Sequence, residues 1–122
     1  MSTILLADDN GPNRELTSVI LERAGFDVVE AKDGADTLRQ LQSSAPDALL
    51  LDLHLPDMDG FEVLRKIRQD ARLATLPIAA VTASAMSSEE ERALASGFDA
   101  YLAKPYEPPQ VVDLVRHLVS GK

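Results

Sequence analysis

The sequence contains no cysteine, which excludes disulfide bonds, thiolate chemistry and zinc sites built on cysteine. Positive charge is scarce: 12 lysine and arginine residues against 20 acidic residues give a formal net charge of -8, which would repel a nucleic-acid backbone. Long apolar runs are also missing, because those at 48–51 and 78–81 fall far short of the roughly 18 residues that a membrane span requires. The amino terminus has neither a basic segment nor a long apolar core, so no secretory signal is indicated. We therefore expect a soluble cytoplasmic domain that binds neither nucleic acid nor membrane.

The residues that are present fit one folded domain. With 122 residues, of which 45% are hydrophobic and 26% charged, the chain can bury an ordinary core. No linker, repeat or low-complexity tract divides it, and the last helical pattern runs almost to Lys122. We therefore expect a single domain over residues 1–122, with no output domain in this chain.

Strand-like runs alternate with stretches of helical periodicity. The expected strands are 3–7, 27–31, 47–51, 78–82 and 100–103. The central runs are apolar on both faces, as a parallel sheet covered on both sides requires. Five strand–helix units in a chain of this length predict a doubly wound α/β fold.

The expected helices lie between these runs. They begin near Pro12, Asp33, Asp59 or Gly60, Ser87 and Pro108. The apolar stripe expected for the first helix consists of Leu16, Val19, Ile20 and Ala24. The stripe expected for the last consists of Val111, Val112, Val115, Leu118 and Val119.

Polar residues stand where four of the expected strands end. The first is followed by Asp8-Asp9, the third by Asp52 and the fifth by Lys104, while the fourth ends on Thr82. Ligands of open parallel sheets bind outside the carboxyl ends of the strands. These residues would therefore meet at one edge if the four strands are neighbours.

Each of these residues also has a plain structural interpretation. Asp8-Asp9 could cap the first helix, Asp52 could begin a solvated turn, and Lys104 could be an ordinary surface lysine. A single acid would suffice for a cap, however, and the complete ordered set favours a functional site.

The ordered set resembles a response-regulator receiver domain, the family of the bacterial chemotaxis receiver. The likeness covers the whole chain, from Asp8-Asp9 through Asp52 and LPDMDG to Thr82-Ala83 and Lys104-Pro105. It implies a flavodoxin-like fold with five helices and a five-stranded parallel sheet in the order 2-1-3-4-5. It also implies a signalling phosphoacceptor of a two-component system or phosphorelay, which catalyses only its own phosphorylation and dephosphorylation.

The resemblance implies a magnesium site. Asp9 and Asp52 would bind Mg²⁺ directly, Asp8 would bind it through water, and the main-chain carbonyl of His54 would supply a further ligand. Mn²⁺ could replace it. Three carboxylates within about 5 Å repel each other by roughly 3 kcal/mol per pair at an effective dielectric near 20, which favours a bound cation or a retained proton. An all-oxygen site with few protein ligands suits Mg²⁺.

The resemblance also assigns the phosphoryl chemistry. Asp52 would attack a phosphoryl group held on a histidine or on a small phosphodonor. The Lys104 ammonium and the Thr82 hydroxyl would stabilise the charge of the transition state. The Lys104-Pro105 peptide bond is expected to be cis by the same resemblance.

Switching and tuning residues follow from the family pattern as well. Thr82 would move towards the aspartyl phosphate, and Tyr101 would swing into the vacated space on the face formed by the fourth helix, fifth strand and fifth helix. His54 and Ser84 would tune the lifetime of the phosphoryl group, and the small Ala83 would leave an approach path beside it.

Two further acids in the same segment have a different interpretation. Asp57 and Asp59 resemble part of a calcium loop, but that loop would place Leu55 and Lys66 at its essential ligand positions. We therefore assign both acids to the turn and to the start of the next helix.

The implied partners are a sensor histidine kinase or histidine phosphotransfer protein and a downstream protein target. The chain would be a single-domain regulator or the receiver of a hybrid kinase, as a monomer or a phosphorylation-dependent dimer. Met86 and Leu94 fit either a partner-binding face or the core. An alternative is an interaction module with the receiver fold that signals without phosphorylation, although it would not need the complete set of polar residues. An aspartate-dependent phosphatase would carry an acid two residues after Asp52, where this chain has His54.

Overall fold

The computed structural model describes residues 2–83 and 87–120 and contains a single parallel sheet. Its strands are β1 (Thr3–Ala7), β2 (Asp27–Ala31), β3 (Ala48–Asp52), β4 (Ile78–Thr82) and β5 (Ala100–Ala103). Their order is β2-β1-β3-β4-β5, which confirms the predicted flavodoxin-like topology. The third strand lies one residue later than expected, so Asp52 is its last residue.

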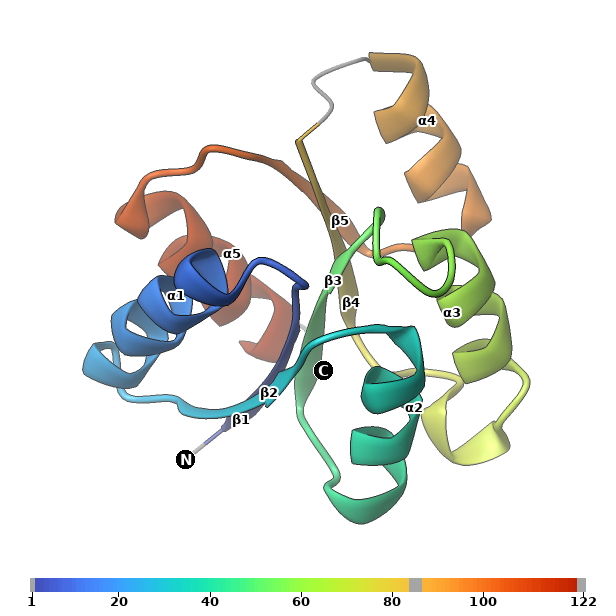
Figure 1. Cartoon of the computed structure of the whole chain (residues 1–122), viewed down its shortest axis with the longest axis horizontal. Coiled ribbons are helices and arrows are strands. Elements are labelled where there is room, and N and C mark those ends of the chain that lie inside the picture. Colours follow the sequence, from blue (N-terminus) through green and yellow to red (C-terminus); the bar gives the residue numbers. More distant parts are fainter. Residues whose placement is uncertain (1, 84–86, 121–122) are drawn as a thin grey trace.

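Helices cover both faces of this sheet. They are α1 (Gly11–Arg23), α2 (Gly34–Ser43), α3 (Gly60–Arg68), α4 (Ser87–Ser96) and α5 (Pro108–Ser120), and a short 3₁₀ helix, η1 (Ala71–Leu73), follows α3. Figure 1 shows the sheet edge-on, with α1 and α5 on one side of it and α2, α3 and α4 on the other. No helix in the described part of the chain is both long enough and apolar enough to cross a membrane.

The core has two layers, one on each side of the sheet. Along β3, Leu49 and Leu51 pack into the layer beneath α2, α3 and α4, whereas Leu50 packs into the layer beneath α1 and α5. Every residue of β3 and β4 is buried. The continuous apolar runs of the sequence therefore form the interior strands, because side chains on both faces need apolar neighbours.

The buried side of α1 differs from the prediction. Leu16 is 61% exposed and Val19 45% exposed, while Thr17, Ser18 and Leu21 are buried. Burial of Thr17 is tolerated because its hydroxyl shares a hydrogen bond of 2.7 Å with the Tyr106 hydroxyl. The expected stripe of α1 was therefore wrong at Leu16 and Val19, whereas Ile20 is partly buried against the core as expected.

The buried side of α5 follows the prediction more closely. Its stripe includes the buried residues Val111, Val115 and Leu118. The remaining two stripe residues, Val112 and Val119, are partly buried against the same layer. The hydrophobic pattern therefore set the orientation of α5 correctly, in contrast to α1.

Candidate functional site

Strand register brings the ends of four strands to one edge of the sheet. Ala7 of β1 lies beside Leu51 of β3, so Asp8 and Asp52 both come one residue later. Asp52 in turn lies beside Val81 of β4, one residue before Thr82. The chain after β5 completes this edge with Lys104.

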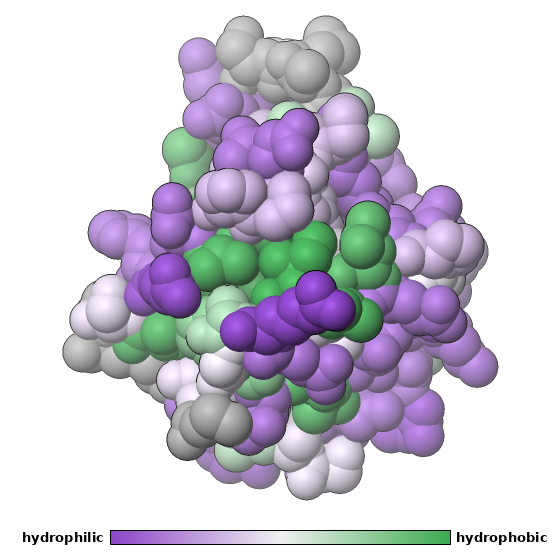
Figure 2. Space-filling model, turned by 90° about the vertical axis from the view of Figure 1, so that its left-hand side faces the viewer, coloured by the Kyte–Doolittle hydropathy of each residue, from purple (hydrophilic) through white to green (hydrophobic). Residues whose placement is uncertain are grey.

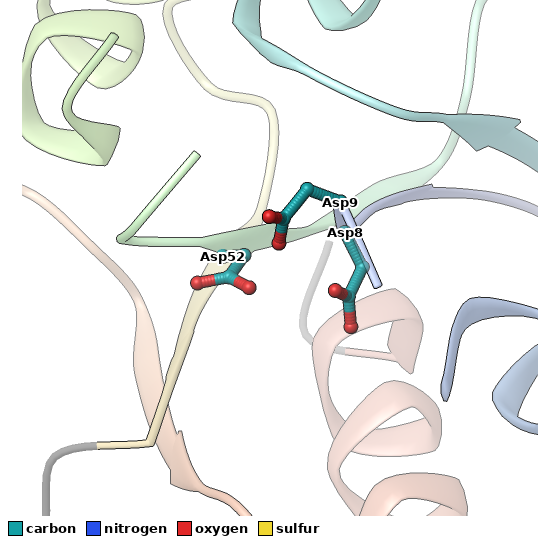
Figure 3. A group of neighbouring side chains, drawn as sticks. All are labelled: Asp8, Asp9 and Asp52. Carbon is teal, nitrogen blue, oxygen red and sulfur yellow. The ribbon is translucent and has the colours of Figure 1, made fainter. Parts of the chain in front are cut away.

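Three carboxylates gather there: Asp8, Asp9 and Asp52 each offer an oxygen atom, and these atoms lie within 4.8 Å of one another. Figure 3 shows Asp8 and Asp9 reaching this point from the chain after β1, and Asp52 from the end of β3. Asp8 and Asp52 are buried, whereas Asp9 is exposed. An all-oxygen group of this kind could hold a hard divalent cation such as Mg²⁺.

Lys104 is the cation that the structure places among these acids. Its Nζ atom lies 2.9 Å from Oδ2 of Asp52 and 3.0 Å from Oδ2 of Asp8. Burial lowers the pKa of Lys104, but the hydrogen bonds and charges of Asp52 and Asp8 outweigh that effect, so the pKa lies above its ordinary value. The ammonium is therefore held in its charged form between two of the three acids.

The remaining oxygens of the two buried acids also have partners. Oδ1 of Asp52 accepts a hydrogen bond of 2.9 Å from the main-chain N–H of His54. Asp8 accepts the N–H of Asn10 at 2.9 Å and the side-chain amide of Asn13. Among the described residues, no hydrogen bond or ion pair reaches the Asp9 carboxylate. Asp9 is thus the acid of the group that is most open to a further ligand.

Arg14 stabilises the loop that carries Asp8 and Asp9, here called the acidic loop. The sequence did not predict this contact. Its guanidinium donates to the main-chain carbonyl of Asp8 at 2.7 Å and to the Glu30 carboxylate at 2.8 Å. Asn10 caps α1 and accepts the N–H of Asn13, which fixes the start of this helix beside the loop. The only sequence signal was an asparagine before Gly11 with a basic residue one turn later.

Two of the three expected tuning residues, His54 and Ala83, follow the strands that end on Asp52 and Thr82. The side chain of His54 is 62% exposed, and its Nε2 atom lies 3.8 Å from a carboxylate oxygen of Glu89 in α4. Ala83 is exposed and directly follows β4. Ser84 and Met86 lie outside the described residues.

The expected switch residues lie on adjacent strands. Thr82 is fully buried at the end of β4. Tyr101 of β5 lies beside Ala80 and is half-buried against the layer beneath α2, α3 and α4. Burial raises the pKa of the Tyr101 phenol, and the nearby charges of Glu89 and Glu90 raise it further. The Lys104–Pro105 peptide bond is cis.

Asp57 and Asp59 serve the starts of two different helices. Asp59 accepts the N–H of Phe61 at 2.7 Å and caps α3, as expected. Asp57 instead accepts the N–H groups of Gly34 and Ala35, at 2.7 and 2.9 Å, so it supports the start of α2. Its assignment to the next helix was therefore wrong, because the loop after β3 folds back over α2.

Comparison with known proteins decides the family. Residues 4–116 match the response regulator receiver domain family. This chain belongs to that family. Receiver domains are signalling phosphoacceptors of two-component systems, and they interact with kinases or phosphotransfer proteins and with downstream targets.

Individual relatives match this receiver domain over nearly its whole length. The polar-differentiation response regulator DivK of Brucella anthropi is 31% identical over 114 residues, which cover 93% of each chain. A putative response regulator from Chloroflexus aurantiacus superposes with a TM-score of 0.92 at 34% identity, covering 98% of both chains. The receiver domain of a Pseudomonas aeruginosa sensor histidine kinase superposes with a TM-score of 0.89 at 31% identity, again over 98% of both. That structure has a magnesium ion coordinated in its active-site cleft.

Proposed function

We propose that this receiver domain accepts a phosphoryl group onto Asp52 from a phosphohistidine of a kinase or phosphotransfer protein. The observation that carries the proposal is the position of the Asp52 carboxylate. It is 5% exposed, lies within 4.8 Å of oxygens of Asp8 and Asp9, and has the Lys104 ammonium on its Oδ2 atom. A surface turn would not bury an acid among two others, whereas a phosphoryl acceptor needs an anion beside groups that can neutralise added charge.

The transfer is a displacement at phosphorus. A carboxylate oxygen of Asp52 would form the new P–O bond while the P–N bond to the donor imidazole breaks, and the imidazole nitrogen would keep the electron pair. The product is an acyl phosphate. Lys104 is already within 3 Å of both acids, so only a small movement would bring its ammonium onto a phosphoryl oxygen. The Thr82 hydroxyl, buried at the end of β4, would bond another.

The acidic residues fit a magnesium ion. Asp9 and Asp52 would be direct ligands together with the carbonyl of His54, and when bound the ion would neutralise charge on the acids and on the phosphoryl oxygens. Three donors, from Asn10, Asn13 and Lys104, already occupy the two oxygens of Asp8, against two donors on Asp52, which favours a contact through water for Asp8. Asp9, which has no such partner among the described residues, is the natural direct ligand.

The side of the molecule formed by α1 and α5 would receive the donor protein. Leu16 and Val19 are exposed on α1, the helix that begins just after Asp8 and Asp9. Figure 2, which views the molecule from that side, shows hydrophobic residues gathered across the middle of the face between hydrophilic borders. A protein that brings a phosphohistidine to the acidic edge must cover the adjacent surface, and this patch would gain from being covered.

The response would pass to the face formed by α4, β5 and α5. Phosphoryl oxygens on Asp52 would draw Thr82 towards them, and Tyr101 would move inwards to fill the space. Tyr101 is half-buried beside Glu89 and Glu90 of α4, so its movement would change the packing of that helix. His54, Ala83 and Ser84 would set how readily water reaches the acyl phosphate.

Incubation with acetyl phosphate and Mg²⁺ tests the proposal directly. Intact-mass spectrometry should record one added phosphoryl group in the wild type and none in Asp52→Asn. Asp59→Asn is the matched control, since it changes a nearby acid that only caps α3. If wild type gained no phosphoryl group from acetyl phosphate or from a phosphohistidine donor, the proposal would be wrong.

A further inference from the structure

A groove between α3 and α4 carries positive charge on a chain whose net charge is -8. It has a volume of about 480 Å³, and its lining includes the apolar side chains of Phe61 and Leu64 and three arginines, Arg65, Arg68 and Arg92. Among the residues that the structure describes, no acidic one lines this groove. The groove shares no residue with the acidic group at the sheet edge, so phosphoryl transfer does not account for it.

Two of the three arginines have no anionic partner among the described residues. Arg68 is engaged: its guanidinium donates to the carbonyls of Leu76 and Gly97 at 2.7 and 3.1 Å and forms an ion pair with Asp99 at 3.3 Å. Arg65 and Arg92 are exposed, and no ion pair to either lies within the described ranges. Arg68 therefore holds the groove together, while Arg65 and Arg92 offer free donors.

Arg92 is held in place from below. Its guanidinium carbon lies 3.9 Å from the centre of the Phe61 ring, and that ring packs edge-on against Phe98 at a centroid distance of 5.7 Å. A guanidinium that lies over an aromatic face keeps its N–H donors free to point outwards in its own plane. Stacking also limits the rotamers of the side chain, so less entropy is lost when it binds a carboxylate.

We propose that this groove binds an acidic segment of a partner protein. A carboxylate of the segment would take the paired N–H donors of Arg92 or Arg65, and a neighbouring apolar side chain would rest on the half-buried ring of Phe61. The groove is open to solvent and would leave much of a small molecule uncovered, whereas small-molecule sites usually bury most of their ligand. Two arginines without an anionic partner are too few for a nucleic acid, whose affinity comes from many phosphate contacts. This site goes beyond the proposed function, because it does not use Asp52.

The test is an NMR titration of the ¹⁵N-labelled, unphosphorylated chain without Mg²⁺, so its outcome does not depend on phosphoryl transfer. The probe is a short synthetic peptide of glutamate, leucine and phenylalanine with blocked ends. A second peptide has glutamine in place of glutamate. We expect the glutamate peptide to shift amide signals of α3 and α4, and the glutamine peptide to bind far more weakly.

Variants locate the binding. Each exposed arginine–carboxylate pair is worth up to about fivefold in affinity, so Arg65→Glu with Arg92→Glu should weaken binding by on the order of tenfold or more. Arg65→Gln with Arg92→Gln should also weaken it and serves if charge reversal disturbs folding. Arg116→Glu, an exposed arginine on α5, is the control and should change nothing.

Several results would overturn the proposal. They are an absence of shifts with the glutamate peptide, equal binding of the glutamine peptide, and shifts confined to other elements. Unchanged affinity in both double variants would do the same. Adenosine monophosphate that bound the groove more tightly than the peptide would identify a small-anion site and overturn the protein partner.

Discussion

Asp52 and Asp57 lie in the same short segment, yet their surroundings are opposite. Asp52 is buried, and two further carboxylates offer oxygens within 4.8 Å of its own. Asp57 is exposed, and each of its oxygens accepts a main-chain N–H from the start of α2. Neutral backbone N–H groups bind both oxygens of Asp57, whereas at the sheet edge three acids gather and Lys104 pairs with two of them. A surplus of like charge, rather than the presence of an acid, distinguishes the candidate reactive site.

Removal of the Lys104 ammonium from the acidic group should have the largest effect. Lys104→Gln deletes the donor on Asp52 and Asp8 and should slow phosphorylation by acetyl phosphate by about 10²–10³-fold, as loss of one preorganised transition-state donor does. The rate is measured by intact mass over time at saturating Mg²⁺. Lys32→Gln, an exposed lysine beside α2, should leave the rate unchanged. A rate within twofold of wild type in Lys104→Gln would show that Lys104 neutralises the resting acids only.

Removal of an acid should weaken Mg²⁺ binding only if that acid belongs to the group at the sheet edge. Asp9→Asn removes the carboxylate most open to a ligand and should weaken Mg²⁺ binding by more than about 100-fold, beyond the cost of losing a supporting contact. Asp57→Asn should have no effect, because that side chain faces only backbone donors. Calorimetric titration with Mg²⁺ measures both. Equal affinities in the two variants would contradict the assignment of the metal site.

Substitution of Arg14 should weaken Mg²⁺ binding less than substitution of Asp9. Arg14→Ala removes the hydrogen bond to the Asp8 carbonyl and the ion pair with Glu30, which hold the acidic loop against β2. Mg²⁺ affinity should fall by about tenfold, the lower end for supporting contacts of a metal site. Arg23→Ala, an exposed arginine at the end of α1, is the matched control. Undiminished affinity in Arg14→Ala would show that the loop keeps its shape without this contact.

The fold was largely predictable from local patterns. The short strand-like runs of the sequence identified all five strands, and the order of the sheet came from the family resemblance. The buried side of α1 was predictable only in part, because apolar Leu16 and Val19 outranked Thr17 and Ser18 by hydrophobicity alone. Thr17 is buried because Tyr106, far away in the sequence, offers its hydroxyl a partner. Hydrophobic periodicity contains no information about such a partner.

The candidate site likewise has residues that the sequence predicted and residues that it did not. The acids and Lys104 were found because each stands at the end of a strand, a position that parallel strands bring to one edge. The sequence did not predict the role of Arg14 or the contact of Asp57 with the start of α2. Their partners, Glu30 and Gly34, belong to other segments of the chain. Residue type and spacing therefore locate groups placed by strand ends, whereas supporting contacts across loops require the structure.

The smallest predicted effect is on stability and concerns Asp57. Asp57→Ala removes the two hydrogen bonds at the start of α2 and should lower the free energy of unfolding by about 1 kcal/mol, as loss of a helix cap does. Phosphorylation by acetyl phosphate should be unchanged. The N–H groups of Ala35 and Gly34 lower the pKa of Asp57 below its usual value of 3.8.

The contribution of Asp57 should therefore be complete above pH 3.8 and disappear as the pH falls through the lower, folded-state pKa. Urea denaturation at neutral pH and at successively lower pH measures the difference between wild type and Asp57→Ala. Asp113→Ala, an exposed acid of α5, serves as the control for general charge effects. A stability difference that persisted unchanged in strong acid would mean that Asp57 acts through packing against α2. In that case Asp57 and Asp52 would differ in where their side chains lie, and not in how their charges are neutralised.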